Sequence, residues 1–206
     1  MSDIKVIGLT GQTGAGKTRV ADLCRQAGIT VIDADQVSRY VVDNDRPLLV
    51  ELTLAFGVTI LNADGTLNRK KLGSIVFGSK GKLERLNKII FPFIRADVDR
   101  RVAELAAGGE RLVVLDAPTL FESGGDKTCD AIVVVTAPLD ARLNRIVIRD
   151  RLTDEEARKR MRSQPDAGFY TERADYIIEN DGSEEALEAK ALKLTAVLKA
   201  LAKEAS

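Results

Sequence analysis

The sequence contains no histidine and only two cysteines among its 206 residues. The absence of imidazole excludes histidine metal sites, Ser-His-Asp hydrolysis and a histidine general base, so proton transfer must use carboxylates or lysine. Cys24 and Cys129 show neither metal-ligand spacing nor a disulfide framework. We interpret both as small buried residues of a protein from a reducing compartment.

Net charge is also absent, because 31 basic residues balance 31 acidic ones. A neutral chain has no global basic field for nucleic acid or an anionic membrane, so any anion site must be local. No apolar run approaches the ~20 residues of a membrane span, and the N-terminus shows no basic leader or cleavage site. We therefore expect a cytoplasmic protein, a monomer or weak homo-oligomer, with no nucleic-acid or membrane partner.

Five short runs rich in β-branched residues predict strands at 5–10, 29–33, 111–116, 131–136 and 176–179. Each run is continuously apolar, which is typical of parallel strands covered by helices on both faces. Helical patterns occupy 17–26, two or three segments between 35 and 107, and then 139–150, 154–164 and about 184–203. The predicted class is α/β, with the strands in one five-stranded parallel sheet between two helical layers.

The stretch between the second and third predicted strands is far longer than a crossover connection needs, which indicates a helical insertion. We predict one domain over residues 1–206 with three parts. They are a core at about 1–35, 108–138 and 174–206, an insertion at about 36–107, and a lid at about 139–173.

A glycine-rich loop follows the first predicted strand and opens the first predicted helix. It reads Gly11-Gln-Thr-Gly-Ala-Gly-Lys17-Thr18, a complete match to the P-loop pattern. Its backbone amides and the helix N-terminus can hold a polyphosphate, Lys17 can reach the β- and γ-phosphates, and the Thr18 hydroxyl can bind Mg²⁺. The alternative is a glycine-rich turn with a solvated lysine. The residues predicted to bind the nucleotide cofactor are Gly11, Thr13, Gly14, Ala15, Gly16, Lys17, Thr18, Val20, Arg142 and Asn180.

Carboxylates follow two of the predicted strands, at the sheet edge where ligands of α/β proteins bind. Asp33 and Asp35 share one face if the strand geometry persists, and either could accept a proton from an attacking hydroxyl or act near Mg²⁺ through water. Capping of the following helix is the alternative. Asp116, after the third strand, is expected near the metal or simply solvated at the strand end.

Arg142, Arg145 and Arg149 recur at three- and four-residue steps and so share one side of a helix. Such a stripe can hold polyphosphate and stabilise transition-state charge, although a solvated charged face has the same pattern. The capping-box pattern at 153–156 then begins another helix, and the two helices together make a lid that excludes water. Asn180, after the last strand, either contacts an adenine ring or forms a turn.

A resemblance covers almost the whole chain. It rests on the order and spacing of six short motifs: Gly8 to Gly11 before the P-loop, Val31 to Asp35 with Arg39, Asp64 to Leu67 with Arg69 and Val76-Phe77, Pro118 to Glu122, Arg149 to Thr153 with Gln164, and Ala174 to Gly182. In these motifs the sequence resembles the dephospho-coenzyme A kinase family, P-loop kinases of small molecules. It departs from the family pattern at Phe91, at Thr119 and at 168–170.

The resemblance implies that ATP with Mg²⁺ phosphorylates the ribose 3′-hydroxyl of dephospho-coenzyme A. It assigns activation of that hydroxyl to Asp35, and steadying of the phosphoryl group to Lys17 with either Arg145 or Arg149. Thr18 and Asp116 are the expected residues at the metal. The alternatives are another P-loop kinase, of the nucleoside monophosphate or shikimate type, or a nucleotide-dependent switch. The sequence has no N-K-x-D guanine motif and does have a predicted lid, which both disfavour the switch.

Overall fold

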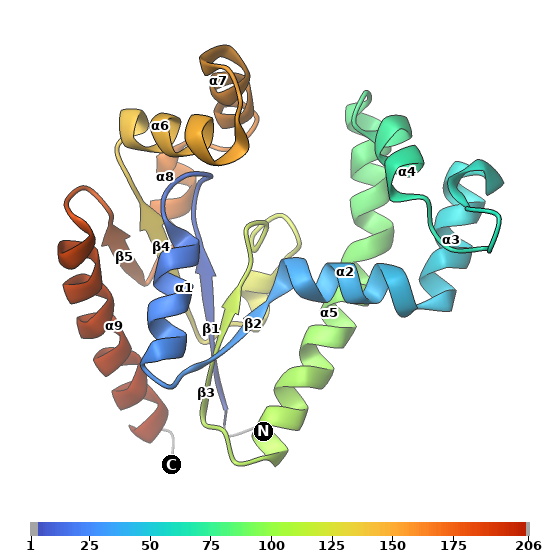
Figure 1. Cartoon of the computed structure of the whole chain (residues 1–206). Helices are drawn as coiled ribbons and strands as arrows, with labels where there is room; N and C mark the ends of the chain where they lie inside the picture. The colour runs from blue at the N-terminus through green and yellow to red at the C-terminus, as the bar shows by residue number, and fades with distance from the viewer. Residues whose placement is uncertain (1–3, 205–206) are drawn as a thin grey trace. The chain divides into compact units, whose positions relative to one another are not determined.

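The computed structural model describes residues 4–204 and contains a five-stranded parallel sheet flanked by helices (Figure 1). The strands are β1 Lys5–Thr10, β2 Thr30–Asp33, β3 Leu112–Asp116, β4 Ala131–Thr136 and β5 Tyr176–Glu179. They lie in the order β2-β3-β1-β4-β5, and all neighbouring strands are parallel. The predicted α/β class is confirmed, and the strand predictions differ only in starting β2 and β3 one residue early.

The chain divides into two compact units. One runs to Asp33 and resumes at Val102, and the other is Ala34–Arg101. Besides the strands, the first unit holds α1 Lys17–Gln26, the 3₁₀ helix η2 Gly125–Thr128, α6 Leu139–Asp150, α7 Asp154–Arg162, α8 Ala167–Thr171 and α9 Glu184–Glu204. The proposed roles of an insertion and a lid stay predictions.

The core of the first unit lies between the sheet and helices α1 and α9, which pack side by side (Figure 1). Alternate strand residues such as Ile7, Leu9 and Val133 face these helices, and Val20 and Leu198 meet them from α1 and α9. All five side chains are almost fully buried. This burial fixes the position of the carboxyl ends of the strands, where the polar residues of the site emerge.

The two cysteines differ in their surroundings. Cys24 is buried in this core, as predicted, whereas Cys129 is only half-buried, and both are free thiols. Burial raises the pKa of Cys24 to about 11 and that of Cys129 to about 12. Both thiols are therefore protonated and unreactive near neutral pH.

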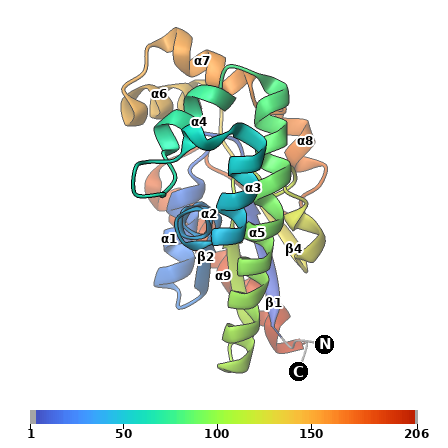
Figure 2. The same cartoon turned by 90° about the vertical axis from the view of Figure 1, so that its right-hand side faces the viewer.

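The second unit is helical. Its elements are α2 Ala34–Asn44, α3 Arg46–Phe56, the 3₁₀ helix η1 Val58–Ile60, α4 Arg69–Val76 and the α5 helix Lys80–Ala107, which continues into the first unit. Figure 2 shows α2 end-on, whereas α5 runs upright in the same view. We expected two or three helical segments between 35 and 107, and the structure has four α-helices there. The Asp45 carboxylate accepts a hydrogen bond from the amide of Leu48 and so begins α3 only two residues after α2 ends.

No helix in residues 4–204 combines the length and apolar character needed to cross a membrane.

Candidate active site

The loop between β1 and α1 has a conformation that requires glycine. Gly14 and Gly16 have φ values of 79° and 101°, in the left-handed region that side chains disfavour. A Cβ at Gly14 would lie 2.7 Å from the backbone oxygen of Arg142, and one at Gly16 would lie 2.2 Å from Nδ2 of Asn180. The loop is thus packed closely against two other segments, and only hydrogen fits at these positions.

Helix α1 begins at Lys17 without a side-chain cap. Its first backbone amides therefore lack the intrahelical acceptors that later amides have, and the helix dipole adds partial positive charge at this end. Because the glycines leave the approach to these amides clear, the loop can accept an anionic group such as a polyphosphate. The residues present fit the triphosphate that the motif predicts.

The Lys17 ammonium donates a hydrogen bond to the Asp116 carboxylate at the end of β3. Both side chains are largely shielded from solvent, with 14% and 8% of their surfaces exposed. Burial raises the pKa of Asp116, Lys17 opposes this shift, and the charge of Asp33 adds to it. Asp33 is the register partner of Asp116 on the neighbouring strand β2. The carboxyl edge of the sheet therefore holds two carboxylates and one ammonium.

Asp35 lies in the first turn of α2, within the helical unit. The expectation that Asp33 and Asp35 share one face of an extended strand is wrong, because β2 ends at Asp33 and α2 begins directly at Ala34. Asp35 is inside this helix and does not precede it as a cap. A carboxylate in a first helical turn interacts favourably with the positive end of the helix dipole.

The three arginines of α6 do not act as one stripe. Arg142 is only 5% exposed, and its Nε donates to the carbonyl of Thr13 at 3.0 Å. Arg145 donates through Nη1 to the carbonyls of Gly14 and Ala15 at 3.2 and 3.4 Å. Arg149 instead pairs with the Asp150 carboxylate at 2.8 Å. Two arginines thus support the P-loop, and the third belongs to the junction of α6 and α7.

Burial leaves a polar atom of Arg142 in an unusual position. Its Nη2, like the hydroxyl of the buried Tyr170, has no hydrogen-bond partner among the residues that the structure describes. Burial also lowers the pKa of Arg142 and raises that of Tyr170 to about 12. Arg142 can therefore still donate to an acceptor that the described part of the chain does not supply.

Asn180 and Val20, both predicted to bind the nucleotide, are buried side chains with contacts inside the protein. Asn180 is 6% exposed, and its Nδ2 donates to the carbonyl of Ala15 at 2.8 Å, so its amide supports the P-loop from the end of β5. Val20 has no exposed surface and belongs to the hydrophobic core. Neither placement tests their predicted contacts with the nucleotide.

The two helices after β4 form the junction that the sequence predicts. Thr153 and Glu156 make a complete capping box at the start of α7, and the Glu156 carboxylate accepts from the Thr153 amide, which lowers its pKa. A small apolar cluster of Leu143, Ile146 and Ala157 joins α6 to α7. The predicted capping box is confirmed, although α7 ends at Arg162, two residues before the predicted end.

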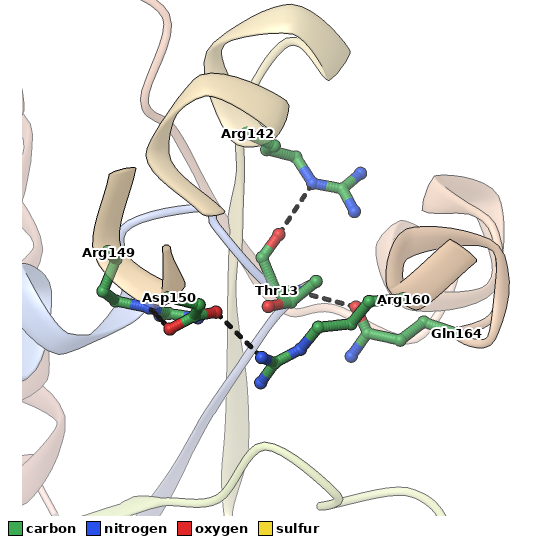
Figure 3. A network of polar contacts seen from close by, with 6 residues as sticks. All are labelled: Thr13, Arg142, Arg149, Asp150, Arg160 and Gln164. Atoms are coloured by element: carbon green, nitrogen blue, oxygen red, sulfur yellow. Dashed lines mark hydrogen bonds and ion pairs between the residues drawn. The ribbon is translucent and has the colours of Figure 1, made fainter. Parts of the chain in front are cut away.

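Sequence patterns assign no role to Gln12, Gln164 or Asp150, yet all three make polar contacts in this region. Figure 3 shows Gln164 against Thr13 of the P-loop, and Asp150 between Arg149 and Arg160. Helix α8 was also missed, and its Phe169 packs edge-on against Phe121 with ring centroids 5.5 Å apart. These contacts join segments far apart in sequence, which periodicity does not reveal.

The parallel sheet, the glycine loop at its edge and the lysine beside a buried aspartate define a P-loop protein that binds the phosphates of a nucleotide. Residues 5–186 match the family described as dephospho-CoA kinase. A dephospho-CoA kinase of Corynebacterium efficiens is 42% identical over 190 residues, 92% of this chain and 95% of that protein. One of Anaeromyxobacter dehalogenans is 41% identical over 196 residues, 95% of this chain and 93% of that protein.

A solved structure shares the fold. The crystal structure of TT1252 from Thermus thermophilus has a TM-score of 0.79 and 31% identity, and covers 95% of this chain and 98% of that one. The chain therefore belongs to the dephospho-CoA kinase family and is an ATP-using kinase of coenzyme A biosynthesis.

Proposed function

We propose that this protein transfers the γ-phosphoryl group of ATP to the ribose 3′-hydroxyl of dephospho-coenzyme A, giving coenzyme A and ADP. The observation that carries the proposal is the P-loop with its glycine-only packing, in a chain whose family match spans residues 5–186. The family match indicates that dephospho-coenzyme A is the phosphoryl acceptor. The P-loop indicates where ATP, the phosphoryl donor, binds.

ATP would bind with its phosphates at the N-terminus of α1. The backbone amides at Gly14 to Thr18 donate to the phosphates, and Lys17 places its charge on the transferred group. Since Lys17 already contacts the buried Asp116, its ammonium is held beside the loop before the nucleotide arrives. The unpartnered Nη2 of Arg142 supports a further contact with an acceptor atom of the nucleotide.

Mg²⁺ would be held by the exposed hydroxyl of Thr18 and, through water, by Asp116. The described residues contain no cluster of three or more histidine, cysteine, aspartate or glutamate side chains that could hold the ion alone. This donor set fits a magnesium ion that takes most of its other ligands from phosphates and water. When bound, the ion neutralises phosphate charge.

Asp35 is the proposed base, and it accepts the proton of the 3′-hydroxyl as that oxygen attacks. The transition state of phosphoryl transfer is loose and rich in charge, so positioning and electrostatic stabilisation contribute more than the base does. Arg145 is the better placed of the two candidate lid arginines, because it already contacts the P-loop carbonyls. Arg149 would join it only if the junction of α6 and α7 moves.

The protein would act in the cytoplasm as a monomer or weak homo-oligomer, on a small molecule, without nucleic acid or membrane. The neutral net charge of the chain supports the absence of nucleic-acid and membrane partners, because it provides no overall attraction to anionic surfaces. The helical unit Ala34–Arg101 would contribute the acceptor site.

An acceptor panel tests the proposal. The purified protein is mixed with ATP, Mg²⁺ and, in separate reactions, dephospho-coenzyme A, AMP, shikimate or buffer alone, and ADP release is followed. We expect rapid ADP release with dephospho-coenzyme A only, and mass spectrometry with a 3′-specific phosphatase should place the new phosphate. Faster release with AMP or shikimate would identify another small-molecule kinase, and equal slow release in all reactions would identify a switch.

A further inference from the structure

Two glutamines join the P-loop to the segment between α7 and α8. The side-chain amide of Gln12 donates to the carbonyl of Pro165 at 2.8 Å. In return, the backbone amide of Thr13 donates to Oε1 of Gln164 at 2.7 Å. These reciprocal hydrogen bonds connect residues 12–13 with residues 164–165, and we call this set of bonds the glutamine clasp.

Arg142 ties α6 to the same two P-loop residues. Its Nη1 donates to Oε1 of Gln12 at 2.5 Å, and its Nε donates to the carbonyl of Thr13 at 3.0 Å. Figure 3 shows Thr13 between Arg142 on one side and Gln164 on the other. The amide and the carbonyl of Thr13 are therefore both bound by side chains from beyond β4.

This restraint matters because the next residue is Gly14. Glycine reaches both halves of the backbone map at similar energy, so the loop that grips the phosphates has little intrinsic preference for one shape. Gly14 has a φ of 79°, and the two peptides before it are held from outside. Gln164 accepts from the N–H of the peptide that ends at Thr13, and Arg142 donates to the C=O of the peptide that joins Thr13 to Gly14. The clasp supplies rigidity that the glycines themselves cannot.

We propose that Gln164 is a positioning residue that prepares the P-loop for the nucleotide, so that affinity for magnesium ATP depends on the lid. The inference rests on the proposed function only for the identity of the nucleotide. A loop already ordered in its binding conformation loses less entropy when a ligand binds, which raises affinity. A glutamine suits this role, since its amide oxygen accepts a hydrogen bond without placing negative charge beside a polyphosphate.

The test uses Gln164→Met in the full chain, a substitution of similar shape that removes the acceptor. Gln26→Met, at an exposed position at the end of α1, is the matched control. The first readout is hydrogen exchange of the Thr13 amide without nucleotide, measured by NMR, and the second is Kd for magnesium ATP by calorimetry. Loss of one neutral hydrogen bond worth ~1 kcal/mol corresponds to about a fivefold change in the exchange rate of the Thr13 amide and in the Kd for magnesium ATP.

We expect Gln164→Met to speed hydrogen exchange of the Thr13 amide and to weaken magnesium ATP binding, each about fivefold. The KM for dephospho-coenzyme A should not change. Gln26→Met should match the wild type in all three measurements. Gln164→Glu should keep the Thr13 amide protected, because it retains an acceptor oxygen, and should weaken ATP binding through its charge. If Gln164→Met fails to fold, Gln12→Met removes the reciprocal bond and should also weaken ATP binding.

Unchanged exchange and unchanged Kd in Gln164→Met would overturn the inference. So would an equal loss of affinity for both substrates, which indicates general loosening of the structure. Failure of the proposed function gives a different pattern, since the wild type would then transfer no phosphate to dephospho-coenzyme A while the exchange and calorimetry experiments still report on the clasp.

Discussion

The P-loop and the junction of α6 and α7 both carry charged groups, but they hold these groups in opposite ways. Lys17 of the P-loop pairs with Asp116 at the end of β3, and only 14% and 8% of their side-chain surfaces are exposed. The glycines of the loop pack closely against other segments of the chain. At the junction, Arg149 and Arg160 share Asp150 and are each at least half exposed, at 56% and 50%.

The difference has an energetic meaning. Charges shielded from water interact strongly because the effective dielectric constant around them is low, whereas exposed pairs are worth ~1 kcal/mol or less. Catalytic electrostatics should therefore be concentrated in the P-loop, and the junction should tolerate the loss of single charges. The predictions below test this contrast in order of decreasing effect.

Lys17→Met should have the largest effect, lowering kcat/KM for ATP by ~10³. The substitution removes the positive charge that we propose acts on the transferred phosphoryl group. Preorganised electrostatic groups of this kind raise reaction rates by factors of ~10²–10³ or more. Steady-state kinetics of ADP release measures it, with Lys193→Met on the exposed face of α9 as the control. A loss below tenfold would mean that the shielded lysine is not the main source of transition-state stabilisation.

Asp35→Asn should come second, lowering kcat by ~10² with little change in KM for ATP. A general base typically raises the reaction rate by a factor of ~10²–10⁴. We expect the factor for Asp35 to lie at the low end of this range, because a loose transition state needs little proton transfer. Single-turnover rates at saturating substrates measure the chemical step. Full turnover in Asp35→Asn would show that this carboxylate is not the base, and a loss larger than that of Lys17→Met would show that proton transfer outweighs electrostatics.

Much of the fold and of the P-loop could be predicted from the sequence, because both depend on local patterns. The P-loop motif is contiguous, and continuous apolarity marks buried strands, so β1, β4 and β5 were predicted to the residue. Asp35 was misplaced because periodicity does not show where a strand stops, and β2 passes into α2 without a connecting residue.

The partners of the arginines could not be predicted, since they are set by tertiary packing. The three-and-four spacing correctly places Arg142, Arg145 and Arg149 on α6, but the pattern is the same whether a guanidinium meets a carbonyl, a carboxylate or water. Gln164 meets Thr13 across 151 positions of sequence. Helix α8 has five residues, too few to show a helical period.

Gly14→Ala should weaken binding of magnesium ATP about 30-fold. The added Cβ would lie 2.7 Å from a backbone oxygen at a φ of 79°, and strain of ~2 kcal/mol must be relieved by moving the loop. Gly28→Ala is the matched control, since its φ of 76° is similar but its Cβ would meet no atom within 4 Å. That variant should lose ~1 kcal/mol of unfolding free energy and bind ATP normally, as measured by calorimetry and denaturant unfolding.

Equal effects of the two alanine substitutions on ATP binding would contradict a role for close packing at Gly14. In that case backbone strain alone, and not the close packing of the P-loop against α6, would account for the loss at Gly14.

Asp150→Asn should have the smallest effect, lowering kcat by about fivefold or less. The Asp150 carboxylate accepts from Nε and Nη2 of Arg149 and from Nη1 of Arg160, each at 2.8 Å, and so aligns guanidiniums from two helices. Asparagine keeps the shape but not the charge, and the pairs are exposed enough that ~1 kcal/mol is the expected limit. The loss should shrink further as salt is added, because exposed charges are screened.

Asp154→Asn is the control for this variant, because Asp154 pairs with Arg158 on its own helix at 2.7 Å. It removes the same charge from the same region, so its kcat should equal that of the wild type. If Asp150→Asn lowers kcat a hundredfold while Asp154→Asn does not, Arg149 and Arg160 contribute as much as the proposed base. The contrast between a shielded P-loop and a tolerant junction would then be wrong, because a carboxylate at the junction would be organising charge that acts on the phosphoryl group.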